Sequence, residues 1–135
     1  LKQAEAKSTE DHTFKVLGLH WAKADQEKTA AAKALLKLQR EDGGWAQLPK
    51  MKSDAYSTGQ ALTALKQSSL LKAGSPQYKR GVAWLLKNQK ADGSWQVKTR
   101  SKPIQKYFES GFPHGKDQFI SISATCWAVM ALLEK

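Results

Sequence analysis

An internal repeat constrains this chain more than any other feature of its sequence. Residues 35–45, shifted by fifty positions, fall on residues 85–95, and seven of the eleven aligned pairs are identical. Each copy contains a Gln-x-x-Asp-Gly-x-Trp turn, whose shared residues are Gln39/Gln89, Asp42/Asp92, Gly43/Gly93 and Trp45/Trp95. Repeats of this length build arrays in which each unit buries its apolar side against the next. The chain is therefore expected to be a stack of similar helical units.

Helical patterns flank both turns. Apolar spacing and capping residues predict five helices. The first is expected over 11–23, the second from an N-cap at Asp25 to 37–40, and the third from a cap at Ser53 or Asp54. The fourth is expected from Ser75-Pro76 to a stop at Asp92-Gly93, and the fifth over 119–135. Amphipathic, Lys-bearing helices alternate with more apolar ones. This alternation predicts an all-α fold of two concentric layers, with the apolar helices inside.

A long irregular stretch, residues 94–118, precedes the last helix. Its Pro and Gly residues break regular structure, while the alternation from Trp95 to Arg100 predicts a short strand and allows a β-hairpin. Its candidate catalytic residues are Glu109, His114 and Asp117, because a carboxylate can orient a histidine for proton transfer. A structural interpretation is simpler, with a turn at His114, a helix cap by Asp117 and a lysine partner for Glu109.

Residues 80–95 read Arg-Gly-Val-Ala-Trp-Leu-Leu-Lys-Asn-Gln-Lys-Ala-Asp-Gly-Ser-Trp. This segment resembles the QW repeat of squalene and oxidosqualene cyclases, whose toroid fold the protein prenyltransferase β subunits share. The copy at 39–45 matches more loosely. The resemblance implies a partial α-α toroid of about two and a half helix-pair repeats, at 11–45, 54–95 and 119–135. It also implies that residues 1–135 form one domain from the C-terminal part of a larger protein.

The repeated motif has a physical rationale of its own. A glycine permits the backbone turn that ends a helix, and a glutamine can donate and accept hydrogen bonds at neighbouring helix ends. In family terms the motif staples adjacent helix pairs. Structural roles are therefore expected for Gln39, Gly43, Trp45, Gln89, Gly93 and Trp95.

The cyclase chemistry implied by the resemblance can be tested on this sequence. Class II cyclases protonate an alkene with an Asp-x-Asp-Asp-Thr-Ala motif at the start of an inner helix. The matching segment, residues 54–59, keeps Asp54 and Thr58 but has Tyr56 where the proton donor should stand. A phenol with a pKa near 10 cannot protonate an alkene. Protonation by this segment is not expected.

The zinc site of the prenyltransferases is lost as well. Its Asp and Cys ligands align with Ser53 and Ala55, and its His ligand aligns with Ala124. We therefore expect neither a catalytic metal nor another cofactor. The lone Cys126 lies on the most apolar helix and is expected to be a core thiol.

An arc of a toroid exposes the apolar inner surface that a complete ring would enclose. Asp54, Tyr56 and Trp127 are expected on this concave face. Its expected covering is the remainder of the parent polypeptide, a second copy of the chain, or an apolar or prenyl-type ligand.

The net charge of +10 lies entirely in residues 50–107, which hold twelve basic and two acidic side chains. Most of it is expected on solvated outer faces of helices. Lys98, Arg100, Lys102 and Lys106 have no acid among them and form a candidate anion-binding loop. Only this charge favours a nucleic-acid partner.

The leading interpretation is a cyclase-like repeat domain that acts as a binding or assembly module without its own catalytic residues. One alternative is part of a terpenoid- or prenyl-processing enzyme whose catalytic residues lie outside this chain. A second is a basic polyanion-binding helical domain. No apolar run could span a bilayer, and the loop sequence Phe108–Gly115 resembles segments of exported bacterial proteins.

Overall fold

The structure, a computed structural model, describes residues 2–102, 104 and 106–133 of the chain. It contains α1 (Thr9–Trp21), α2 (Asp25–Lys37), α3 (Ala55–Gln67), α4 (Pro76–Asn88), a short 3₁₀ helix η1 (Gly115–Asp117) and α5 (Gln118–Leu133). The predicted all-α class is therefore confirmed. None of these helices is long and apolar enough to cross a membrane.

Side-chain caps decide where most of the helices begin. The helix α1 begins at Thr9, two residues before the expected start, because Ser8 caps it: the Ser8 hydroxyl accepts a hydrogen bond from the Asp11 N–H. Asp54 and Ser75 cap α3 and α4 as expected. Asp25 was wrongly expected as an N-cap: it is the first residue of α2, and its carboxylate accepts from Lys28. The last two residues of the expected 119–135 helix lie outside the described residues.

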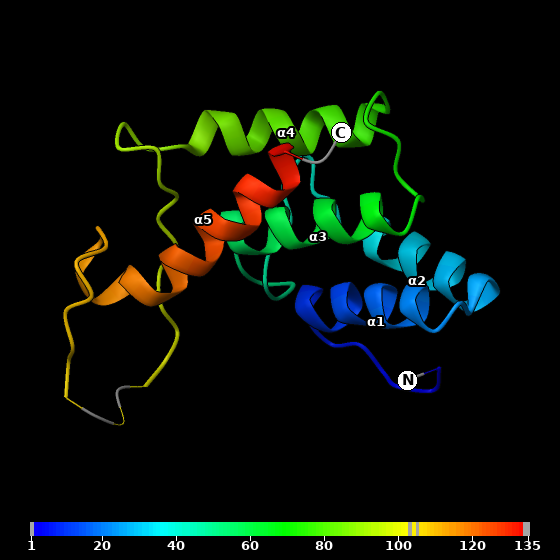
Figure 1. Ribbon diagram of the computed structural model, residues 1–135, viewed down its shortest axis with the longest axis horizontal. Coiled ribbons are helices and arrows are strands. Elements are labelled where there is room, and N and C mark those ends of the chain that lie inside the picture. The colour runs from blue at the N-terminus through cyan, green and yellow to red at the C-terminus, as the bar shows by residue number, and fades with distance from the viewer. Residues whose placement is uncertain (1, 103, 105, 134–135) are drawn as a thin grey trace.

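The helices form two layers (Figure 1). The first, third and fifth helices run in roughly the same direction, whereas α2 and α4 run in the opposite one. The central helix α3 contacts all four others, and every residue from Ser57 to Leu65 is buried. This arrangement agrees with an arc of a helical toroid, in which α1, α3 and α5 are the inner helices.

The two Gln–Trp turns, residues 39–45 and 89–95, have matching internal hydrogen bonds. The side-chain Nε2 of each glutamine donates to the carbonyl of the glycine four residues later, and both distances are 2.9 Å. Each glycine adopts a left-handed conformation, with φ of 91° at Gly43 and 83° at Gly93. A side chain would be strained there, which explains why both copies have glycine.

The tryptophans anchor each turn to an outer and an inner helix. Both are buried, and their indole N–H groups donate to the carbonyls of Leu35 and Leu85, at 2.9 and 2.8 Å. Their backbone N–H groups donate to a threonine hydroxyl on the following inner helix, Thr58 for Trp45 and Thr125 for Trp95. The two Gln–Trp turns thus share these hydrogen bonds, as expected for a repeat.

The segment after Trp95 contains no strand, so the predicted short strand is wrong, and the described residues of 94–118 form no hairpin. Its N–H groups pair with side chains at the start of the last helix. Val97 N donates to the Ser121 hydroxyl, and Thr99 N donates to the Asp117 carboxylate. The alternation reflects this packing, since Trp95 and Val97 are buried while Gln96 is exposed.

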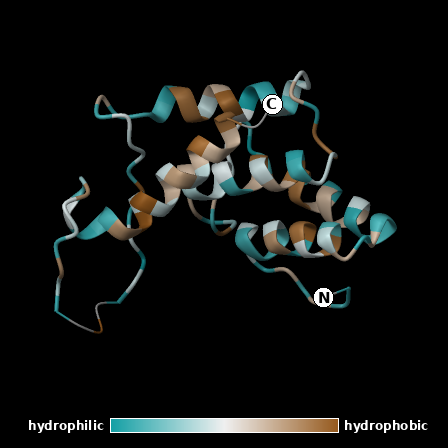
Figure 2. Ribbon diagram, in the orientation of Figure 1, coloured by the Kyte–Doolittle hydropathy of each residue, from teal (hydrophilic) through white to brown (hydrophobic). Residues whose placement is uncertain are grey.

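The last helix, α5, is apolar over most of its length (Figure 2), but only some of its residues are buried. Its small residues Ala124, Ala128 and Ala131 are buried against the rest of the molecule. Large apolar side chains remain exposed on its other side: Phe119, Val129, Met130 and Leu133. Cys126 shares this exposure, so the expectation of a core thiol was wrong.

Candidate functional site

The inner helices carry the three residues expected on the concave face, beginning with Asp54 at the N-terminus of α3. Its carboxylate accepts hydrogen bonds from the Ser57 N–H at 2.8 Å and from the Gln47 side chain at 2.9 Å. Burial raises the pKa of Asp54 above its usual value, although these hydrogen bonds act in the opposite direction. The carboxyl group therefore serves as a helix cap.

Tyr56 stands where the cyclase motif has its proton-donating acid. Its hydroxyl donates to the Glu10 carboxylate on α1 at 2.7 Å. Burial, reinforced by Glu10, raises the pKa of Tyr56 to about 12. The phenol therefore keeps its proton and links two inner helices.

Trp127, on α5, packs edge-to-face against Phe14 of α1, with ring centroids 6.4 Å apart. The helices α3 and α5 approach closely at Gly59, where an added Cβ would lie 2.6 Å from the backbone carbonyl carbon of Trp127. The structure thus directs Tyr56 and Trp127 toward the same neighbour, α1, at Glu10 and at Phe14.

Three buried polar side chains in α1 and α3 were missed by the sequence interpretation. Gln60 is fully buried and lies one turn after Tyr56. Its side-chain amide is near the Tyr56 hydroxyl, but it makes no hydrogen bond of good geometry with the described residues. The hydroxyls of Thr13 and Thr63 are also buried and have no hydrogen-bond partner in the described part of the chain. A glutamine within an Ala- and Leu-rich inner helix was the available signal. Such groups are costly unless something pairs with them.

The loop candidates do not form a single site. His114 Nε2 lies 2.7 Å from the Ser94 hydroxyl, which donates to Asp92 at 2.6 Å. Glu109 instead accepts from the Tyr107 hydroxyl and from the Gly111 N–H, not from a lysine.

The structural interpretation expected Asp117 to cap the last helix, but its side chain makes other hydrogen bonds. Its carboxylate accepts from the Thr99 N–H and the Gln96 side chain, which fixes the extended segment after the second turn. Together with the His114–Ser94 contact, these bonds give the three candidates separate structural partners.

The four basic residues of the candidate anion-binding loop have different surroundings. Arg100 donates from Nε to Gln47 at 2.8 Å and so joins the network around Asp54. Lys98 lines a hollow of about 380 Å³ with Lys52 and Lys90. Lys102 and Lys106 are exposed. Anion binding by this set stays a prediction.

Two layers of alternating helices, joined by repeated Gln–Trp turns, define a helical-repeat protein of the α-α toroid class. A comparison with protein families finds that the model of the squalene-hopene cyclase C-terminal domain matches residues 6–135. The chain belongs to this family. A search of curated proteins finds no match.

Proposed function

We propose that this chain is a non-catalytic cyclase-like repeat domain that serves as a binding or assembly module of a larger protein. A further helix pair of the same kind would dock beside α4 and α5 and cover the surfaces that they leave open. The observation that carries the proposal is a difference between the two otherwise matching Gln–Trp turns.

The first turn is occupied by the outer helix α4. Besides its bond within the turn, Gln39 donates to the carbonyl of Gln77 at 2.8 Å and accepts from Arg80 at 2.9 Å. A Cβ on Gly43 would lie 2.7 Å from the Arg80 carbonyl oxygen. The turn and the helix are therefore in direct contact through backbone and side chains.

The second turn has the same internal bonds and no such occupant among the described residues. Gln89 is exposed, and its own amide nitrogen, 4.0 Å away, is the only atom that an added Cβ on Gly93 would meet. Because an equivalent surface is used in the first repeat, the second is suited to an equivalent helix. Repeat arrays are stabilised by such contacts between neighbouring units.

The apolar residues exposed on the inner helix α5 support the same proposal. Phe119 is 54%, Met130 41% and Leu133 73% exposed along one side of α5. Large apolar side chains exposed along one side of a helix mark a surface that a partner covers.

The state of the two groups at the cyclase motif supports the non-catalytic part of the proposal. Protonation of an alkene needs a strong acid. The raised pKa values of Asp54 and Tyr56 make both groups weaker acids than their free side chains.

Dye binding and light scattering test the proposal. The isolated chain is expected to bind a hydrophobic dye or to self-associate, and Met130→Glu on the exposed side of α5 should reduce both without loss of helical circular dichroism. Gln26→Glu, at an exposed position of α2 away from α4 and α5, is the control for the added charge and should leave both unchanged. A monomeric wild type that binds no dye would contradict the proposal.

A further inference from the structure

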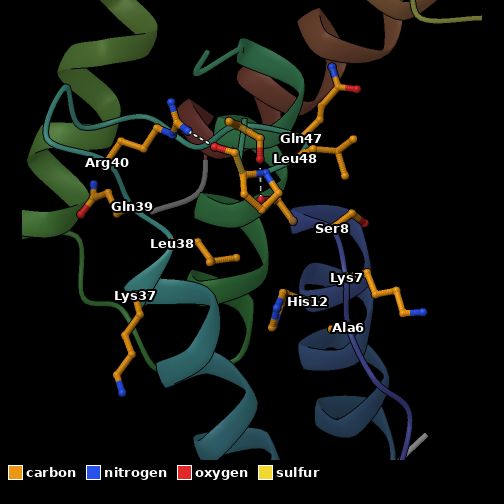
Figure 3. Close-up of a pocket in the computed structure, with 13 residues that line it drawn as sticks. Ala6, Lys7, Ser8, His12, Lys37, Leu38, Gln39, Arg40, Gln47 and Leu48 are labelled. Carbon is orange, nitrogen blue, oxygen red and sulfur yellow. Dashed lines mark hydrogen bonds between the residues drawn. The ribbon is translucent and has the colours of Figure 1, made fainter. Parts of the chain in front are cut away.

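A hollow of about 480 Å³ opens between the start of α1, the end of α2 and the turn after it (Figure 3). Its size lies within the range of roughly 300–1,000 Å³ that small-molecule sites occupy. Part of its wall is apolar, and it includes Leu38 and Leu48, which are 37% and 36% exposed. Two half-open leucines on one hollow provide a surface for an aliphatic group.

The other lining groups make the hollow strongly basic. Its charged and titratable lining residues are Lys7, His12, Lys37 and Arg40, and none of the described acidic residues lines it. Arg40 donates to the Pro49 carbonyl at 2.6 Å. The amines of Lys7 and Lys37 form no ion pair within the described part of the chain. The two residues lie on opposite rims, and in Figure 3 their flexible side chains point away from the hollow, so each would turn inward to reach a ligand there.

His12 stands in the gap between α1 and α2 (Figure 3). Burial is the main cause that lowers its pKa; Lys15 adds to this effect and Asp11 opposes it. From the facing elements, the nearby charges are those of Lys7, Lys37 and Arg40. An anion bound here would favour the protonated imidazole.

We propose that this hollow binds an anionic amphiphile, with a carboxylate or phosphate head near Lys7, His12 and Lys37 and a short aliphatic chain against Leu38 and Leu48. The site is built from α1, α2 and the first Gln–Trp turn, and it uses neither α4 and α5 nor the second Gln–Trp turn. It is therefore independent of the assembly function proposed above.

The hollow at the second repeat provides an internal contrast. Lys90 lines it at the position equivalent to Arg40, but Lys98 replaces Leu48 in the alignment and the Asp54 carboxyl group also lines it. A hollow in which a carboxyl group lies among the basic side chains is less suited to an anionic head group. The proposal therefore assigns the site to the first repeat alone.

Titration calorimetry on the full chain with octanoate and with octyl phosphate tests the proposal. At least one is expected to bind, and their relative affinity identifies the head group. Lys37→Gln should weaken binding about two- to fivefold. Lys87→Gln, at the equivalent position of the second repeat and outside both hollows, should leave it unchanged. For octanoate, whose carboxylate stays ionised over this range, affinity should rise from pH 8 to pH 6, and His12→Gln should remove that dependence.

Several results would overturn the proposal. These are no binding of either amphiphile, binding of octanol as tight as that of octanoate, and binding of inorganic phosphate as tight as that of octyl phosphate. Binding that Lys37→Gln does not change would place the ligand elsewhere, for example on the apolar side of α5. Because Met130→Glu tests that surface separately, failure here leaves the assembly proposal intact.

Discussion

Gln39 and Gln89 are equivalent residues with different surroundings. Gln39 joins its turn to Gln77 and Arg80 of α4, whereas Gln89 bonds only within its own turn among the described residues. Gln39→Ala is expected to lower the free energy of unfolding by about 1–3 kcal/mol, because it leaves half-buried partners unpaired. Gln89→Ala should cost less than about 1 kcal/mol. Urea unfolding followed by tryptophan fluorescence measures both, and equal losses would contradict the assigned contacts.

Asp42 makes the stability of the first turn depend on pH. Burial alone would raise its pKa, but hydrogen bonds from the Gly44 N–H, the Ser53 hydroxyl and the Trp84 indole together lower it below 3.8. A carboxyl group whose pKa is lower in the folded state stabilises the fold above its unfolded pKa, and this contribution is lost as the pH falls through the folded value.

The stability difference between the wild type and Asp42→Asn should therefore be largest near neutral pH and shrink below about pH 4. Urea unfolding at a series of pH values measures it. The other acidic groups titrate in both proteins, so the difference isolates Asp42. A difference that stays constant down to pH 2 would show that the ionised carboxylate does not stabilise the turn.

At the scale of elements, Gly59 sets how closely α3 and α5 pack. An added Cβ would meet backbone atoms of Trp127 and Ala128 at 2.6–2.8 Å, and backbone cannot move aside as a flexible side chain can. Gly59→Ala is expected to destabilise the protein by about 1–3 kcal/mol despite the better helix propensity of alanine. Gly74→Ala, with nothing within 4 Å, is the control and should change stability by less than about 0.5 kcal/mol. Thermal unfolding compares them, and similar midpoints would disprove the close approach.

At the scale of elements, the sequence predicts the turns better than the contacts between distant segments. The Gln, Gly and Trp positions act within one turn, so the pattern predicted their structural roles. The alternation after Trp95 correctly marks which side chains are buried, but alternation cannot reveal that the partners of the backbone are the Ser121 hydroxyl and the Asp117 carboxylate rather than a second strand. Cys126 was misplaced because an apolar helix does not show which of its sides has a neighbour.

The functional candidates were less predictable than the fold, since they depend on contacts between distant residues. The pairing of Tyr56 with Glu10 spans 46 positions and follows from the packing of α1 on α3. His114 and Glu109 are close in sequence, yet the turn at 111–115 gives them Ser94 and Tyr107 as partners. The hollow beside His12 combines three separate segments, and no local motif marks it.

For the whole molecule, the central claim concerns the two matching Gln–Trp turns. The helix α4 covers the first, whereas no described helix covers the second, which we propose to be a docking surface for a further helix. Hydrogen exchange of matched backbone amides tests it most directly. Arg40 and Gly43 form the same turn bonds as Lys90 and Gly93. The account predicts exchange at least about tenfold faster at Lys90 and Gly93, because their turn can open without displacing a neighbouring helix. Equal protection of the two turns, or stronger protection of the second, would contradict it.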